Sequence, residues 1–327
     1  MQTRTSFFAQ QAANRRNSLL LVLVVVALLA ALGFAIGYGT SGAVEGGLYV
    51  TIGAVILALL MSAGSYFAGD KLVLASSGAR EVSQEQAPQL MNVVREQSLA
   101  AGTPMPKVYI IEDTAPNAFA TGRDPQHASV AITTGLLQKL DREELQGVIG
   151  HELSHVRNFD IRFALLVAVL VGSIALMADF FLRFTFWGGG RRGGSRDRGG
   201  GGGLAVIMFV IAIVLAILAP IVARFVQLAV SRQREYLADA SSVEITRNPY
   251  GLERALAKIS SDKEVLEVAN RATQHLYFTN PIKKFEDRSS SMFSTHPAIV
   301  DRINRLRELT GEAPLQPQEV RALAGLD

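Results

Sequence analysis

The 327-residue chain contains no cysteine. This absence excludes disulfides, thiolate metal ligands and a cysteine nucleophile, and it fits a reducing compartment. Charge is also scarce: 19% of the residues are charged and 49% are apolar, which is skewed for a soluble protein. The net charge of +3 is too small to indicate a nucleic-acid partner, and no basic helix with interleaved aromatic residues is found. We therefore expect no nucleic acid among its partners.

Four apolar runs account for this composition. Residues 18–37, 48–69 and 204–223 are uncharged, and each has the roughly 20 residues that a helix needs to cross a bilayer core of about 30 Å. The run 163–187 contains Asp179 and Arg183, so its uncharged part is short for a span. We expect four apolar helices that cross the lipid bilayer. For the last two runs, a hairpin that dips into the membrane or packs on other helices is the alternative.

Basic residues near the N-terminus indicate the orientation of these helices. The first 17 residues carry three arginines and no acid, so the positive-inside rule places the N-terminus, and the chain from Asp70 onward, in the cytoplasm. The glycine-rich linker 188–203 carries four arginines and would lie outside if both later runs cross, which conflicts with this rule. Because the first helices usually dominate orientation, we keep the cytoplasmic assignment.

A metal-binding pattern occupies His151 to His155, with the sequence HELSH. Two histidines four residues apart share one face of a helix, so both imidazoles can bind one metal ion. Glu152 can then act on a water that the metal activates. Asp141 and Glu144 are spaced as a capping box, which predicts a helix that carries the pattern. Together these features indicate the chemistry of a zinc peptidase, and a satisfied polar patch is the alternative.

A catalytic zinc needs three protein ligands and one open position. Glu235 and Asp239 lie four residues apart, so we predict Glu235 as the third ligand and Asp239 as a hydrogen-bond acceptor for a ligand histidine. Gly188 follows His155 by 33 residues, and Glu235 follows Gly203 by 32. Two antiparallel helices of matched length would bring the halves of the site together. The alternative is that both acids face solvent, as most helical acids do.

The same features predict the division of the chain. In order, we expect an N-terminal transmembrane hairpin, the first half of a catalytic domain with the motif helix, a second apolar hairpin with the glycine/arginine-rich linker, and the second half of the catalytic domain with the third zinc ligand: residues 1–70, 71–160, 161–230 and 231–327.

Alternating and β-branched residues predict strands at 107–111 and 128–133. Asn117, Ala118 and Phe119 lie between them, and we expect a short edge strand there. Such an edge can pair with an extended substrate through backbone hydrogen bonds, which makes these residues candidate substrate contacts. The alternative is that Asn117 is a turn former and Phe119 a core residue.

His296 precedes a proline and a predicted helix. We consider two roles for it, as a cap on the open zinc position at rest or as a hydrogen-bond donor to the oxyanion. The alternative is a loop histidine that orders the start of the helix.

Four motifs, at residues 117–122, 151–160, 234–240 and 294–297, resemble the HtpX family of membrane-bound zinc metalloproteases. This gluzincin-type family is related to the prenyl-protein (CAAX) endopeptidases. The resemblance implies a zinc metalloendopeptidase with one Zn²⁺ per chain, in the bacterial inner (cell) membrane, multi-pass, with a cytoplasmic catalytic domain. It also implies quality control, with membrane proteins and unfolded polypeptides as substrates.

Taken together, the sequence predicts a mainly α fold with a small β-sheet, that is, an α+β zincin-like catalytic domain, plus the four apolar helices. Glu152 is the predicted general base and proton donor in amide hydrolysis, with zinc held by His151, His155 and Glu235. Two alternatives remain open. An intramembrane metalloprotease is disfavoured because charges flank the motif on both sides. A membrane scaffold with structural zinc would have no use for Glu152. The oligomeric state is not indicated.

Overall fold

A computed structural model describes residues 7–187, 202–262, 278, 297–316 and 318–323. The chain divides into two compact units. The mixed unit comprises residues 1–11, 66–164 and 231–327, and the helical unit comprises residues 12–65 and 165–230. Segments on both sides of the second apolar hairpin therefore meet in the mixed unit.

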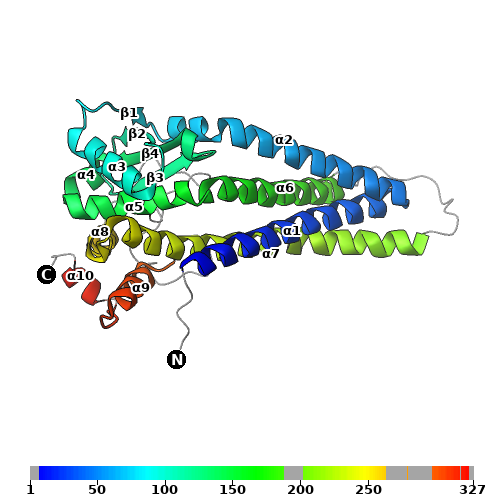
Figure 1. The fold of residues 1–327 in the computed structure, drawn as a ribbon. Helices are drawn as coiled ribbons and strands as arrows, with labels where there is room; N and C mark the ends of the chain where they lie inside the picture. Colours follow the sequence, from blue (N-terminus) through cyan, green and yellow to red (C-terminus); the bar gives the residue numbers. More distant parts are fainter. Residues whose placement is uncertain (1–6, 188–201, 263–277, 279–296, 317, 324–327) are drawn as a thin grey trace. The chain divides into compact units, whose positions relative to one another are not determined.

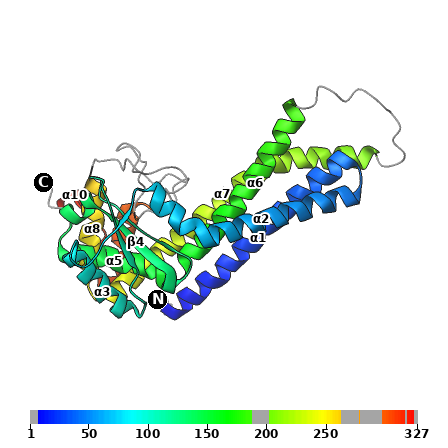
Figure 2. The same ribbon diagram turned by 90° about the horizontal axis from the view of Figure 1, so that it is seen from above.

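The helical unit contains the greater part of the four longest helices. These helices are α1 (Phe7–Ser41), α2 (Val44–Ser76), α6 (Asp160–Trp187) and α7 (Gly202–Thr246). Within this unit they run side by side in both views (Figures 1 and 2). Their buried residues form one apolar cluster in which alanines on α7 face larger side chains such as Leu29, Leu32 and Ile174. Small residues on one helix and large ones on its neighbours allow close packing without voids.

Glycines set the closest approaches between these helices. A Cβ added at Gly37 of α1 would lie 2.2 Å from the carbonyl oxygen of Gly46 on α2. A Cβ at Gly39 would lie 2.7 Å from the Cα of Phe209 on α7. Real Cβ atoms do not approach backbone so closely, so glycine is required at both positions.

Three stretches of helix in the described residues are long and apolar enough to cross a membrane. They are Leu23–Ser41, Val44–Gly64 and Val206–Phe225, with mean hydropathies of 2.2, 2.0 and 3.2. Many of their apolar side chains are exposed on the outside of the protein, for example Ile52 and Ile56. Helix α6, which contains the run 163–187, is not among these candidates, so a fourth span is not confirmed.

The mixed unit contains one four-stranded sheet. Its strands are β1 (Arg80–Glu81), β2 (Lys107–Ile111), β3 (Ala118–Gly122) and β4 (Ala128–Thr133), in the spatial order β1-β2-β4-β3. Strands β2 and β4 are parallel, and the other two pairs are antiparallel. A short 3₁₀ turn, η1 (Pro125–His127), joins β3 to β4. Strand β3 therefore lies at one edge of the described sheet.

Several helices complete this unit (Figure 1). They are α3 (Pro88–Ala101), α4 (Thr134–Lys139), α5 (Arg142–Arg157), α8 (Pro249–Ser261), α9 (Ile299–Thr310), α10 (Glu319–Leu323) and the ends of the long helices. Helix α5 is central, because it packs against α3, α8 and strand β3. The predicted fold class is thus confirmed: the chain is mainly helical with a small mixed sheet. The predicted strands at 107–111 and 128–133 correspond to β2 and β4.

Candidate metal centre

Helix α5 carries the HELSH pattern in the most buried part of the mixed unit. Its start is set by the predicted capping box: the Glu144 N–H donates to Asp141, and the Asp141 N–H donates to the Glu144 carboxylate, at 2.9 and 2.8 Å. Both bonds satisfy donors that a helix end leaves without a partner. The helix then continues through His151, Glu152 and His155 to Arg157.

Small residues let two other helices approach the back of α5. A Cβ added at Gly147 would lie 2.6 Å from the backbone nitrogen of Leu252 on α8. A Cβ at Gly150 would lie 3.0 Å from the Oγ of Ser242 on α7, and this hydroxyl donates to the Gly147 carbonyl at 2.7 Å. Close packing with α7 is what brings Glu235 and Asp239 to the motif.

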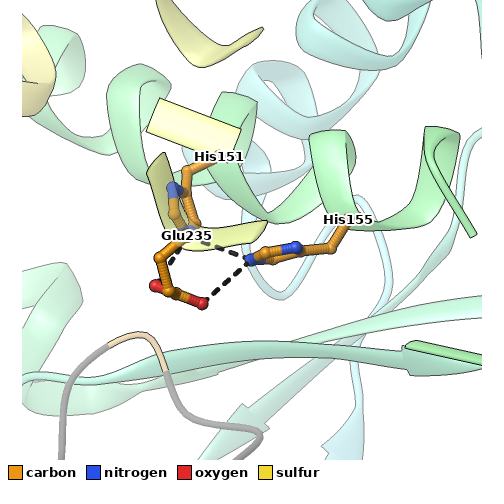
Figure 3. Close-up of side chains that lie close together, drawn as sticks. All are labelled: His151, His155 and Glu235. Atoms are coloured by element: carbon orange, nitrogen blue, oxygen red, sulfur yellow. Dashed lines mark hydrogen bonds and ion pairs between the residues drawn. The ribbon is translucent and has the colours of Figure 1, made fainter. Parts of the chain in front are cut away.

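His151, His155 and Glu235 come together although 80 residues separate the last two. One ligand atom from each lies within 4.8 Å of the others (Figure 3). The two Nε2 atoms are 3.1 Å apart. Glu235 places one carboxylate oxygen 3.7 Å from Nε2 of His151 and the other 3.5 Å from Nε2 of His155. All three donors point toward one position.

This arrangement fits a tetrahedral metal ion. Zinc–ligand bonds of about 2.0–2.1 Å place neighbouring ligand atoms about 3.3 Å apart, which lies within the observed spread. The Nδ1 atom of each histidine faces a carboxylate, so each imidazole keeps its N–H on Nδ1 and turns the Nε2 lone pair toward the site. Two nitrogens and one carboxylate are a zinc-type donor set.

Two aspartates hold the histidines in this orientation. Asp239, four residues after Glu235 on α7, lies 2.9 Å from Nδ1 of His151. Asp160, the first residue of α6, lies 3.0 Å from Nδ1 of His155. The residue before it, Phe159, has a φ of 58°, a left-handed conformation that costs a residue with a Cβ about 1–2 kcal/mol. This turn places the Asp160 carboxylate beside Nδ1 of His155.

Glu152, next to His151 on α5, is 2% exposed. Its carboxyl has a pKa raised to about 7, mainly by burial; the charge of His155 lowers this pKa and that of Glu235 raises it. The backbone N–H of Ala120 on β3 donates a hydrogen bond to this carboxylate. A carboxyl group with a pKa near neutrality is suited to accept and return a proton.

The surrounding charges also shift the pKa values of His155 and Asp239, which pair with different partners. Burial lowers the pKa of His155, but its hydrogen bonds with Asp160 and Glu235 outweigh this effect and raise it well above the usual value. Burial raises the pKa of Asp239, but the charge of Arg302 and the hydrogen bond with His151 hold it below its usual value. The site therefore attracts a positive charge between its imidazoles and Glu235.

The three candidate substrate contacts lie in and beside β3. Asn117 is buried, and its side-chain oxygen accepts the N–H of Ala118, which orders the start of the strand. The Ala118 carbonyl points away from β4 and accepts the backbone N–H of Phe278 at 2.7 Å. Phe119 is fully buried and packs in an apolar cluster with Ile111. Contact of these residues with a substrate stays a prediction.

Three functional candidates were not singled out by the sequence patterns: Asp160, Arg234 and Arg302. Asp160 and Arg234 are visible in the motifs that carry the family resemblance, although their spacing does not indicate a role. Arg302 is 0% exposed and donates to both oxygens of Asp239. A lone arginine 63 residues from its partner has no local signal. His296 lies outside the described residues.

Comparisons with known proteins agree with this geometry. The sequence profile described as "Peptidase family M48" matches residues 84–310. Among similar proteins named "Protease HtpX homolog", that of Listeria monocytogenes serovar 1/2a is 47% identical over 309 residues, covering 92% of this chain and 99% of its own. Those of Streptococcus uberis and Thermoanaerobacter pseudethanolicus are each 44% identical, over 92% and 94% of this chain and 99% of their own.

The crystal structure of S. mikatae Ste24p has a similar fold, with a TM-score of 0.50 and 17% sequence identity. The match covers 91% of this chain and 66% of the Ste24p chain, just under two thirds of its length. At this identity the likeness concerns the fold alone. The family profile and the near-complete relatives carry the assignment: the chain belongs to peptidase family M48 and is a membrane metallopeptidase of the HtpX type.

Proposed function

We propose that this metallopeptidase is a zinc-dependent endopeptidase with one zinc ion per chain. We further propose that it cleaves damaged or misfolded membrane proteins, and unfolded polypeptides, at segments exposed to the cytoplasm. Its setting would be a bacterial inner (cell) membrane that it crosses several times, with the mixed unit on the cytoplasmic side. The basic N-terminus and the relatives in Streptococcus and Listeria support this setting.

One observation carries the catalytic part of the proposal: Glu152 is buried beside His151, His155 and Glu235 and is not one of the three converging donors. A structural zinc site usually closes with four protein ligands, whereas a catalytic site keeps a position open. The described residues supply three donors and a separate buried carboxyl group, whose pKa is shifted by the charges of His155 and Glu235. This arrangement favours hydrolysis over the scaffold alternative.

The chain's own residues then have distinct roles. His151, His155 and Glu235 would hold the ion, which when bound polarises a scissile carbonyl and activates water. Glu152 accepts the proton of the attacking water and returns it to the leaving amine. The pKa of about 7 allows both directions of this transfer near neutral pH. Burial of Glu152 and His151 keeps bulk water away from these groups.

Strand β3 is the proposed site for the substrate backbone. The Ala120 N–H and the Ala118 carbonyl both point away from β4; Ala120 donates to Glu152, and the Ala118 carbonyl accepts from the N–H of Phe278. An extended polypeptide that adds to this edge would take the place of the Phe278 contact and lie beside Glu152. Recognition through backbone groups is tolerant of side chains, as proteolysis of many unfolded sequences requires.

The test is a protease assay on the detergent-solubilised full chain with an unfolded protein as substrate. We expect cleavage that is lost on treatment with a chelator and restored by about one equivalent of zinc per chain. Activity that survives complete removal of metal would contradict the proposal. The substrate assignment is checked separately, by comparing cleavage of a membrane protein in its native form and after heat damage. Equal rates on both forms would refute the quality-control role.

A further inference from the structure

Each of the two site histidines lies against an aspartate that itself pairs with an arginine. The first set is His151, Asp239 and Arg302, and the second is His155, Asp160 and Arg234. The two sets share no residue and draw on four helices, α5, α6, α7 and α9. Arg302 is fully buried, and Arg234 is 12% exposed.

The geometry at Arg302 is a two-point contact. Its Nη2 and Nε atoms donate to the two carboxylate oxygens of Asp239, at 2.7 and 2.9 Å. The oxygen that accepts from Nη2 also lies 2.9 Å from Nδ1 of His151. Because a planar guanidinium matches a carboxylate at two points, it fixes the plane of the carboxylate as well as its position. The ring of His151 is thereby given one orientation.

Arg302 has further contacts that hold it in place. It is 0% exposed, its Nη1 donates to the Phe278 carbonyl at 3.1 Å, and its guanidinium lies 4.7 Å from the centre of the Phe278 ring. Nη1 also lies 3.4 Å from a carboxylate oxygen of Glu235. An arginine held at this many points cannot change rotamer freely, so the orientation of Asp239 is rigid.

The second set has the same order of partners around His155, but its arginine contacts the carboxylate at one point. Arg234 donates to one oxygen of Asp160 at 2.5 Å, and the other oxygen lies 3.0 Å from Nδ1 of His155. Arg234 directly precedes the ligand Glu235 on α7. The same stretch of helix thus supplies one ligand and fixes another through Asp160, which the left-handed Phe159 places there.

We propose that Arg302 and Arg234 are positioning residues for metal binding, which fix the two aspartates and through them the direction of both Nε2 lone pairs. The inference rests on the proposed function only in that the bound group is a divalent metal. Loss of partners that orient metal ligands typically weakens binding 10- to 100-fold. We expect substitution of each arginine to weaken metal binding by this factor.

A charge effect alone would give a different result. If the arginines only offset the negative charge of the aspartates, a lysine in their place would serve equally well. If Arg302 positions its carboxylate, lysine fails there, because an ammonium group is a point donor without the two-point geometry. Substitution of arginine by lysine therefore separates positioning from charge.

The experiment measures zinc affinity of the detergent-solubilised full chain by competition with a chromophoric chelator. Arg302→Lys, which loses the two-point contact, and Arg234→Ala, which removes the donor to Asp160, are each expected to bind zinc about 10- to 100-fold more weakly than the unmodified chain. Arg305→Lys is the matched control on the same helix as Arg302, since Arg305 is exposed and lies over the Tyr236 ring at 4.0 Å. Its zinc affinity should be unchanged.

Thermal unfolding of the metal-free variants provides the second measurement. A purely structural role would lower the melting temperature of the metal-free chain and leave zinc affinity intact in whatever remains folded. Zinc affinity of Arg302→Lys and Arg234→Ala within twofold of the unmodified chain would overturn the proposal. If Arg302→Lys does not fold, Arg234→Ala and Asp160→Asn test the second set by the same titration. If the unmodified chain binds zinc but cleaves no substrate, the proposed function is refuted, whereas the zinc-affinity test of the two arginines still applies.

Discussion

The two units of this protein differ most in what they bury. The cluster inside the helical unit consists of leucine, isoleucine, valine, alanine and phenylalanine. The mixed unit buries His151, Glu152, Asp239 and Arg302 almost completely. Apolar burial stabilises at roughly 25 cal/mol per Å², whereas a buried charge is costly unless it is paired. The first interior is built for stability, and the second accepts an energetic cost at the site of its chemistry.

The outer surfaces of the two units also differ in how apolar they are. Exposed apolar side chains follow one another along the helical unit, among them Ile52, Ile56 and Leu60. A patch of this extent on a protein in water would promote association, whereas lipid tails accommodate it. The mixed unit also exposes many charged residues, some of which form surface ion pairs such as Arg142 with Glu96. An exposed apolar side chain is therefore suited to contact with lipid in the helical unit, whereas in the mixed unit it is an ordinary surface residue.

The largest effect we predict concerns the charged interior. Glu152→Gln keeps the shape of the side chain but removes the proton acceptor, so cleavage should fall about 10²- to 10⁴-fold. Zinc affinity should stay unchanged, because Glu152 is not one of the three donors. Cleavage rate and bound zinc are measured on the same preparation.

The control for this variant is Glu143→Gln, on the same helix. Its carboxylate is exposed and pairs with Arg254 at 2.8 Å, a type of contact that contributes little. Turnover by Glu152→Gln at the rate of the control would show that the assignment of the base is wrong.

An intermediate effect is expected from the exposed apolar surfaces. Ile56→Lys places a charge near the middle of a membrane-crossing stretch of α2, at a cost of about 2.5–3.5 kcal/mol. Leu99→Lys, on α3 of the mixed unit, changes a side chain that is even more exposed, at 77% against 52%. The membrane-integrated fraction after alkaline extraction should drop severalfold for the first variant and stay constant for the second.

If the membrane-integrated fraction changes equally in both variants, the proposed difference between the two surfaces is wrong. An equal loss would mean that Leu99 also lies in an apolar environment. No loss in either would mean that this stretch of α2 does not contact lipid.

The smallest effect concerns close helix packing. Gly147→Ala introduces a Cβ at 2.6 Å from the Leu252 backbone and should destabilise the mixed unit by about 1–3 kcal/mol. Gly53→Ala on α2 meets nothing within 4 Å and gains helix propensity of up to about 1 kcal/mol. Thermal unfolding in detergent should shift in opposite directions. A neutral Gly147→Ala would show that α5 and α8 can separate without loss.

Much of the fold followed from patterns within short windows of sequence. Apolar length predicted the stretches now found in α1, α2 and α7, and the spacing of Asp141 and Glu144 predicted the start of α5. These features depend on neighbours a few residues apart, so the sequence displays them directly. The run 163–187 was the uncertain one, since Asp179 and Arg183 interrupt it, and its crossing is not confirmed.

The candidate site divides in the same way. The chain by itself determined that His151 and His155 share a helix face, because a spacing of four is close to the 3.6 residues of a helical turn. It also pointed to Glu235 and Asp239. Only the tertiary structure showed that Arg302 forms an ion pair with Asp239 and that Asp160 pairs with both His155 and Arg234. These contacts join different helices, and no local periodicity encodes which buried charges will meet.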